Sequence, residues 1–591
     1  MNKAPFFSLS IADNLRHRSW LPLVLIVASF VLMFGPSWGL YLELGSDPYR
    51  FDGDVRTFVP PLYRLTDPSL FPGSDAVDYF ANITPIGYLA LFSMLNPWFD
   101  PMVSTKVVGA ILYWLGVGIL GAASARLSGW AGAWVSMALA FSVGPNISGL
   151  PHDFSWPILC GATAALLHGR VYWLAATALL GAAFYFTSGV IIGIVLFLWL
   201  FIWPKSDRGD AKEWSWNRRV VFLLITGLLF VAVSSKQIIS SRQYGPILTA
   251  DYCQSYPEIG PKGRLGHSSV CVPLDPLLNT LKHLSLHTLT DGRGGEPFSY
   301  TLRISGKWAF DKLGIHRDTL LISLLWVFIL AGISLSLIRE AAGRRLLIVL
   351  AAGLTCYYLA RPYAPMLYLP DRYLEKTVPI FLLIAFPASF AGLFKLAQSR
   401  WHVRLLRHSL ARPLFVVFVG CATLLLLGGR GNTVGGFSHN LNQFIPLMDY
   451  LRTLPKDVII AGWPKGKALE SIPLLAKRNI LLSLETHVPY HKVYVDALRP
   501  KTYALIDAYF ATTTQPLIDL RDRFGVTHLL VEIDRFSGNH FYHISPFAEY
   551  AKQKKQAGES QGFEILRQIP HAQTFSMPDI SVLDLRKLKV P

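Results

Sequence analysis

The stretch MVSTKVVGAILYWLGVGILGAAS, residues 102–124, decides the fold class of this chain. It is almost entirely apolar and longer than the roughly 20 residues that cross a hydrocarbon core about 30 Å thick. Such a segment predicts a transmembrane helix.

Apolar runs of suitable length recur on both sides of this segment. Together they predict about eleven spans, at 20–42, 102–124, 130–147, 155–168, 171–185, 188–203, 219–239, 319–338, 344–360, 375–396 and 412–428. The run 171–203 is too long for one span, so we divide it at Thr187-Ser188-Gly189. The segment 83–96 is too short to cross and is expected to lie in the interface or to re-enter. The sequence therefore predicts a polytopic α-helical membrane protein.

Composition supports this class and excludes others. The 591 residues are 52% hydrophobic and 16% charged, and their mean hydropathy is +0.37, which argues against a soluble globule. The net charge of +17 comes from basic residues beside the apolar runs. These are topology signals, so no nucleic-acid partner is expected.

The basic loops also set the orientation. If the N-terminus is cytoplasmic, the loops on its side hold Arg126, Arg170, Lys205, Arg208, Lys212, Arg218, Arg219, Arg339, Arg344, Arg345, Lys395, Arg400, Arg404, Arg407 and Arg412. The short loops 148–154 and 185–189 on the other face carry neither Lys nor Arg. An odd number of spans then places everything after about residue 430 outside. The first apolar run, 20–42, is expected to be a signal anchor and not a cleavable signal peptide.

This topology predicts a transmembrane domain over 1–430, with outer loops 43–101 (the first outer loop) and 240–318, and an extracytoplasmic tail over 431–591. In the tail, DVIIAGWP, NILLSLE and GVTHLLVEID have the pattern of strands, while 465–477 and 501–524 have that of helices. Alternating strands and helices predict a small α/β domain with a mostly parallel sheet. Because no glycine-rich phosphate loop follows a strand, no nucleotide cofactor is expected.

Two of the five cysteines share an extramembrane loop. Cys253 and Cys271 lie in 240–318 and are expected to form a disulfide if that loop faces an oxidising compartment, and to stay free otherwise.

The first outer loop is the place to look for chemistry. It carries Glu43, Asp47, Asp52, Asp54, Asp67, Asp75 and Asp78. A structural or solvated role is expected for all but Asp52 and Asp54. An aromatic, proline-rich stretch follows this pair and is expected to lie flat on the bilayer. This arrangement predicts that the two carboxylates lie at the height of a lipid phosphate. Paired carboxylates there can act as a general base or hold a divalent cation, with Asp52 as the candidate metal ligand.

A second predicted outer loop carries basic residues, against the positive-inside trend, and their positive charge can complement the carboxylates of the first outer loop. Arg361, Arg372 and Lys376 occur in ARPYAPMLYLPDRYLEKTVP, between the ninth and tenth predicted spans. They either reach to the interface from a helix end or bind a lipid-linked phosphate. His152 and Asp153, in GLPHDFSWP, are likewise either a capping pair or contacts for an acceptor.

Two segments carry a resemblance to a known family of membrane proteins. They are FDGDVRTFVPPLYRLTDPSLFP, residues 51–72, and YLPDRYLEKTVP, residues 368–379. With this topology, the chain resembles the GT-C superfamily of membrane glycosyltransferases, and its tail resembles that of bacterial GT-C-like proteins. The resemblance implies sugar transfer, with inversion, from a polyprenyl-phosphate donor to a glycan, lipid or protein acceptor at the outer face of a bacterial plasma membrane. It makes Asp54 the base, Asp52 its neighbour or a ligand of Mg²⁺ or Mn²⁺, and Arg372 or Arg361 the phosphate contact.

Two alternatives stay open. A transporter or flippase of a lipid-linked or amphiphilic substrate would also be polytopic, but the spans are nearly free of ionisable residues and show no repeated halves. The second alternative is a noncatalytic assembly factor or receptor whose tail binds a partner.

Overall fold

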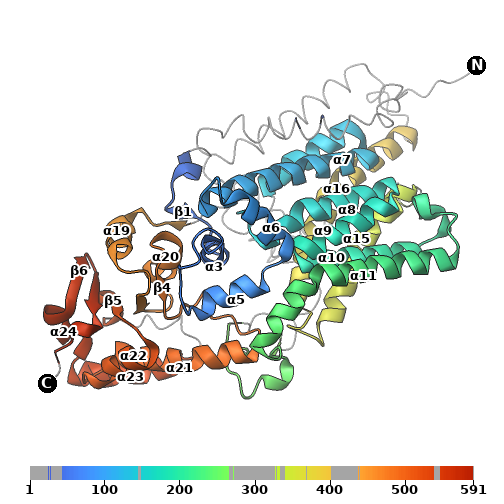
Figure 1. Ribbon diagram of the computed structural model, residues 1–591. Coiled ribbons are helices and arrows are strands. Elements are labelled where there is room, and N and C mark those ends of the chain that lie inside the picture. The colour runs from blue at the N-terminus through green and yellow to red at the C-terminus, as the bar shows by residue number, and fades with distance from the viewer. Residues whose placement is uncertain are drawn as a thin grey trace, which may run out of the picture.

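The computed structural model describes residues 43–143, 148–264, 270–271, 340–367, 369–400, 437, 439–537 and 546–589, with a few isolated positions between them. A helical bundle lies at one end, the tail with its sheet at the other, and the first outer loop between them (Figure 1). Almost all of the predicted spans 20–42 and 319–338, and all of 412–428, fall outside the described residues.

The first helices of the bundle form a hairpin. Helix α7, Pro101–Val143, consists of two helices joined at Gly129, whose φ is +69°. Ser136 donates a hydrogen bond to the Ser124 hydroxyl at 2.7 Å, and the Tyr113 hydroxyl donates to the Ala140 carbonyl at 2.8 Å. Residues twelve apart on one straight helix would be about 18 Å apart, so the chain must reverse between them. This confirms the predicted break between 102–124 and 130–147.

Helices α8 (Ser155–His168), α9 (Val171–Phe184), α10 (Phe186–Phe197) and α11 (Trp216–Ser241) follow. The run 171–203 breaks at Tyr185, two residues before the predicted Thr187. Close glycine packing explains the position, because a Cβ on Gly181 would lie 2.5 Å from the Gly189 nitrogen. Two helix backbones that touch at residues 181 and 189 must turn midway between them.

The last described helices of the bundle are α15 (Ala341–Ala360) and α16 (Pro370–Arg400). Among the described residues, four helices are long and apolar enough to cross a membrane: Pro101–Trp130, Trp216–Tyr244, Ala341–Ala360 and Pro370–Gly392. Helices α8, α9 and α10, at 14, 14 and 12 residues, are shorter. The predicted number of eleven spans is therefore not confirmed, whereas a bundle of apolar helices is.

The tail is built on a five-stranded sheet of order β4-β3-β5-β7-β6. Its strands are β3 (Ile459–Gly462), β4 (Asn479–Ile480), β5 (His528–Glu532), β6 (Gln573–Met577) and β7 (Ile580–Asp584). All three predicted strands are present. The expected mostly parallel sheet is wrong, because β3 pairs parallel with β4 and β5 while β7 pairs antiparallel with β5 and β6. No strand is predicted over 573–584, where β6 and β7 form a hairpin.

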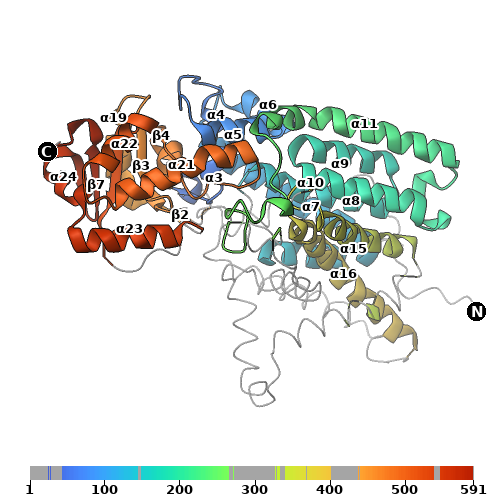
Figure 2. The same cartoon turned by 90° about the horizontal axis from the view of Figure 1, so that it is seen from below.

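Helices cover this sheet and connect its strands. They are α19 (Ile445–Thr453), α20 (Lys467–Leu475), α21 (Lys492–Tyr509), α22 (Gln515–Phe524), α23 (Ala548–Gln561) and α24 (Glu564–Ala572). The predicted helical stretch 501–524 is thus two helices. Helix α21 extends from the tail toward the first outer loop in both views (Figure 2).

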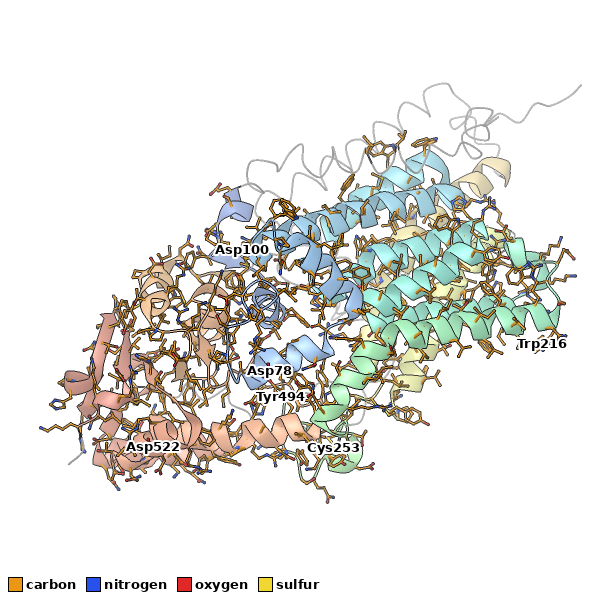
Figure 3. The ribbon with its side chains drawn as sticks, in the orientation of Figure 1. Asp78, Asp100, Trp216, Cys253, Tyr494 and Asp522 are labelled. Carbon is orange, nitrogen blue, oxygen red and sulfur yellow. A yellow bond between two sulfur atoms is a disulfide. The ribbon has the colours of Figure 1, made fainter. Side chains whose placement is uncertain are left out.

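The first outer loop packs into the tail. Its elements are β1 (Arg50–Phe51) and the helices α3 (Val55–Phe58), α4 (Pro60–Tyr63), α5 (Asp75–Ile83) and α6 (Ile86–Leu95). Tyr79 stacks on Tyr494 of α21 with ring centroids 3.9 Å apart, and Figure 3 labels Tyr494 on α21 and Asp78 on α5. Helix α6 is the segment too short to cross, and its neighbour Trp98 is 80% exposed.

Candidate functional site

Asp52, Gly53 and Asp54 form a turn between β1 and α3, hereafter the D-G-D turn. The Asp52 carbonyl accepts from the Val55 amide at 3.2 Å, and the Asp54 carbonyl accepts from the Thr57 amide at 3.0 Å. Asp54 is the N-cap residue of α3, but its side chain makes no capping hydrogen bond and is exposed, whereas Asp52 is half-buried. The backbone thus fixes both residues and leaves the Asp54 carboxylate in solvent.

The carboxylate of Asp52 is held by the protein. Its Oδ1 accepts from the Gly53 amide at 2.8 Å, and its Oδ2 accepts from the Ser148 hydroxyl at 2.9 Å. Ser148 lies in the described part of the segment between α7 and α8, so this hydrogen bond joins the first outer loop to the bundle.

The same segment contains His152 and Asp153. Asp153 is 4% exposed, and its Oδ2 accepts from the backbone amides of Ser148 at 2.8 Å and Leu150 at 2.9 Å. His152 Nε2 lies 3.4 Å from Asp153 Oδ1. Asp153 therefore caps the turn that contains Ser148, whose hydroxyl donates to Asp52. These contacts connect four residues in one network: Asp52, Ser148, Asp153 and His152.

Gly149 makes this loop geometry accessible. Its φ is +75°, and a Cβ at this position would lie 2.1 Å from the Thr105 carbonyl oxygen on α7. Both the backbone conformation and the close approach require glycine.

Lys376 on α16 extends the network toward the bundle. The His152 ring lies 6.5 Å from the Tyr185 ring, and Lys376 Nζ lies 6.0 Å from the centroid of the same Tyr185 ring. Lys376 and Thr377 also line a small, mainly apolar cavity between α8, α10, α15 and α16.

Arg361 and Arg372, the two arginines predicted to contact a phosphate, lie at the end of α15 and at the start of α16. Arg372, in the first turn of α16, donates from Nη1 to Glu375 at 2.9 Å and is exposed. Arg361 is the C-cap residue of α15, and its guanidinium lies 5.9 Å from the centroid of the Tyr357 ring. The structure thus brings Asp52, His152, Asp153 and Lys376 together through a chain of contacts. Arg372 lies one turn before Lys376 on α16, where it pairs with Glu375, and the contact of Arg361 is with Tyr357 of its own helix.

Four of the other carboxylates in the first outer loop have structural partners. Asp67 accepts from Lys456 at 2.6 Å, Asp75 pairs with Lys501 and Asp78 with Arg64. Asp47 accepts from the Tyr49 amide at 2.9 Å. Within the described part of the chain, no cation forms an ion pair with Asp54.

His439 also lies at this site, although it is not among the residues predicted for it. Strand β2 (His439–Asn440) pairs antiparallel with β1, and Phe51 is opposite His439. The imidazole stacks on the Phe51 ring with centroids 6.3 Å apart and an interplanar angle of 9°. Burial, followed by the charge of Arg56, lowers the pKa of the His439 imidazole. No pattern in the sequence indicates this pairing across almost 400 residues.

An ion pair between the loop and the tail was missed as well. Arg56 on α3 pairs with Glu470 on α20, and their side chains are 7% and 6% exposed. Arg56 Nε also donates to the Gly53 carbonyl at 3.0 Å. Burial raises the pKa of Glu470 to about 6 against the attraction of Arg56. The pair fastens the D-G-D turn to the tail.

A divalent cation at Asp52, which the sequence leaves open, finds no preformed group of ligands in the part of the chain that the structure describes. Among the described residues, no group of three or more His, Cys, Asp or Glu side chains is arranged to hold a metal ion. Both carboxylate oxygens of Asp52 accept hydrogen bonds from protein donors, and Asp153 Oδ2 accepts two.

The chain matches no family model and no curated protein sequence. It is similar to the solved archaeal oligosaccharyltransferase AglB from Archaeoglobus fulgidus in complex with an inhibitory peptide and a dolichol-phosphate, at TM-score 0.47 and 11% identity over 98% of this chain and 75% of that one. It is also similar to ArnT from Cupriavidus metallidurans bound to undecaprenyl phosphate, at TM-score 0.48 and 10% identity over 96% and 98%. A structure of the Archaeoglobus fulgidus oligosaccharyltransferase with Zn and sulfate gives TM-score 0.46 and 10% identity over 88% and 69%. At these scores and identities, the likenesses assign neither a family nor a function to this chain.

Proposed function

We propose that this protein is a membrane glycosyltransferase that moves a sugar from a polyprenyl-phosphate donor to an acceptor at the extracytoplasmic face of a bacterial plasma membrane. The observation that carries the proposal is the D-G-D turn. It presents one exposed carboxylate, Asp54, beside a second, Asp52, that is fixed by Ser148. The substrate class comes from the resemblance of the sequence to GT-C enzymes.

The position of the site suits a lipid-linked donor. Met94, near the end of α6, and Trp98, just beyond it, are 73% and 80% exposed and give the first outer loop an apolar surface. Arg372 and Lys376 lie in the first two turns of α16, which begins the apolar stretch Pro370–Gly392. Cations at the end of an apolar span lie at the depth of lipid phosphates.

In the proposed reaction, Asp54 accepts the proton of an acceptor hydroxyl while the acceptor oxygen attacks the anomeric carbon of the donor sugar. The bond between that carbon and the phosphate oxygen breaks, and the electron pair leaves with the polyprenyl phosphate. Arg372 and Lys376 stabilise the negative charge that develops on the phosphate. Asp52 and its network fix the orientation of the turn, with His152 at the acceptor side. A single displacement of this kind inverts the anomeric configuration.

The test uses the full chain in membranes that are supplied with a polyprenyl-phosphate-linked sugar. We expect Asp54→Asn to lower transfer by about 10² to 10⁴-fold, the range typical of a lost general base. Asp67→Asn is the matched control, since it removes an exposed carboxylate from the same loop, where Asp67 pairs with Lys456. Unchanged transfer in Asp54→Asn would remove Asp54 from the role of base.

The same assay separates a transferase from a transporter. A glycosyltransferase releases free polyprenyl phosphate in step with product, whereas a flippase of the same donor moves it across the bilayer without breaking the bond. Donor that changes leaflet but stays intact in the wild type would contradict the proposed transfer.

A further inference from the structure

Two very short strands join parts of the chain that are far apart in sequence. Strand β1, Arg50–Phe51, and strand β2, His439–Asn440, pair antiparallel, with Arg50 opposite Asn440 and Phe51 opposite His439. A two-residue ladder supplies little stability of its own. The side chains packed on it must therefore determine how firmly the D-G-D turn is held.

The His439 imidazole packs directly on that turn. Its Cε1 lies 3.3 Å from the place that a Cβ on Gly53 would occupy, and its ring stacks on Phe51. One ring of the tail thus covers both the residue before Asp52 and the residue between Asp52 and Asp54. Because Gly53 has no side chain, the ring can approach the turn this closely.

The turn is held from a second direction by the tail. Arg56 donates to the Gly53 carbonyl and pairs with Glu470 on α20. Its Nη2 lies 3.5 Å from the same Cβ position on Gly53. Gly53 is therefore enclosed by an imidazole from β2 and by a guanidinium anchored to α20.

We propose that His439 is a positioning residue for the two carboxylates of the D-G-D turn, so that the extramembrane tail takes part in building the transfer site. The inference rests on the proposed function. The imidazole acts through its packing on Phe51 and Gly53, and it transfers no proton. A displacement of about 1 Å of a reacting group can cost about 10²-fold in rate, so the loss of this packing affects the chemical step more than donor binding.

The experiment compares His439→Ala, His439→Phe, Gly53→Ala and the double variant His439→Ala with Gly53→Ala, each in the full chain. We expect His439→Ala to lower kcat about 10 to 100-fold, with KM for the donor within about threefold of wild type. His439→Phe keeps a flat ring on Phe51 and should restore most of kcat. Gly53→Ala should lower kcat in the wild-type background, yet cost little once the ring is absent, because the two changes act on one contact.

His491→Phe is the matched control. His491 Nδ1 hydrogen-bonds the Tyr79 hydroxyl at 2.8 Å, so this variant also removes a contact between the first outer loop and the tail, but away from the D-G-D turn. It should leave kcat within about threefold of wild type. Equal losses in His491→Phe and His439→Ala would show general loosening of the interface and overturn the positioning role. A fully inactive His439→Phe would indicate proton transfer and would overturn it as well.

A second measurement does not depend on turnover. Hydrogen–deuterium exchange of the peptide covering residues 50–58 should rise in His439→Ala and stay near wild type in His439→Phe and His491→Phe. Normal exchange and normal kcat in His439→Ala, with Asp54→Asn inactive, would refute this inference alone. A wild type that transfers no sugar would refute the proposed function, while the exchange result would still report whether His439 holds the turn.

Discussion

Arg56 of the first outer loop and Glu470 of the tail, 414 residues apart in the chain, form an ion pair whose side chains are both more than nine-tenths buried. Removing one partner of such a pair leaves the other charge buried and uncompensated, which typically costs about 3–5 kcal/mol. The pair is therefore a principal connection between the loop that carries Asp52 and Asp54 and the domain that carries His439.

The first prediction concerns the stability of this junction. Arg56→Met should destabilise it by about 3–5 kcal/mol, whereas Arg56→Met combined with Glu470→Met should cost clearly less, because no charge is then left buried. The melting temperature of the full chain in detergent checks this order. Asp449→Asn serves as the control, since its pair with Arg452 is 58% and 44% exposed and should contribute under about 1 kcal/mol. A double variant less stable than Arg56→Met would contradict the prediction.

The second prediction concerns pH. Burial raises the pKa of the Glu470 carboxyl from 4.5 to about 6, so the folded chain binds this proton more tightly than the unfolded chain does. The contribution of Glu470 to stability is thus greatest below pH 4.5 and declines as pH rises through about 6. Glu470→Gln cannot ionise and should lose this decline. Melting temperatures of both proteins between pH 4 and 7 test it, and parallel curves would refute the assigned cause.

The parts of the fold that the sequence predicted have local patterns. Apolar runs long enough to cross a membrane predicted the helices on either side of Gly129, and short apolar segments between turns predicted β3, β4 and β5. The D-G-D turn was singled out because it follows the first predicted span in an acidic, aromatic loop. Each of these sequence patterns is contained in about 25 consecutive residues or fewer.

The parts that were missed depend on contacts between distant segments. His439 meets Phe51 through a two-residue strand, and Ser148 meets Asp52 through a single hydroxyl, so neither leaves a periodic pattern. The position of Arg344 in a basic loop predicts only a topology signal, and nothing in the local sequence indicates its ion pair with buried Asp207. The hairpin of β6 and β7 did have a signal, because Pro578-Asp579 separates two short segments of strand character.

The third prediction concerns the hydroxyl that holds Asp52. Ser148→Ala removes the 2.9 Å hydrogen bond and should lower transfer about tenfold, while Ser148→Thr, which keeps a hydroxyl, should retain most of it. Gly149→Ala should be worse than Ser148→Ala, since its Cβ would lie 2.1 Å from the Thr105 carbonyl oxygen at a φ of +75°. Transfer rates in membranes with equal amounts of each folded variant check this order. Equal rates in Ser148→Ala and wild type would show that Asp52 needs no such support.

The fourth prediction concerns the far end of the bundle. Asp207 is fully buried, accepts from Arg344 Nε at 2.6 Å and from Nη2 at 2.5 Å, and its backbone carbonyl accepts from Arg345 Nε at 2.6 Å. Asp207→Asn should destabilise the chain by about 3 kcal/mol, because it leaves the guanidinium of Arg344 without its counter-charge. Asp210→Asn is the control, since its pair with Arg170 is 39% and 62% exposed. Equal melting temperatures for the two variants would contradict the prediction.

The last prediction concerns the disulfide between Cys253 and Cys271, which the sequence left open and the structure contains. It closes a loop with a sequence separation of 18, for which restriction of the unfolded chain gives about 3 kcal/mol. The segment it braces is bound to α21 by the Glu258 carboxylate, which accepts two hydrogen bonds of 2.7 Å from Arg499. A reductant should therefore lower the melting temperature of the wild type but not that of Cys253→Ser with Cys271→Ser, which should already melt at the reduced value. A wild type whose melting temperature ignores the reductant, with the thiols shown to be free by labelling, would exclude a stabilising role for this bond.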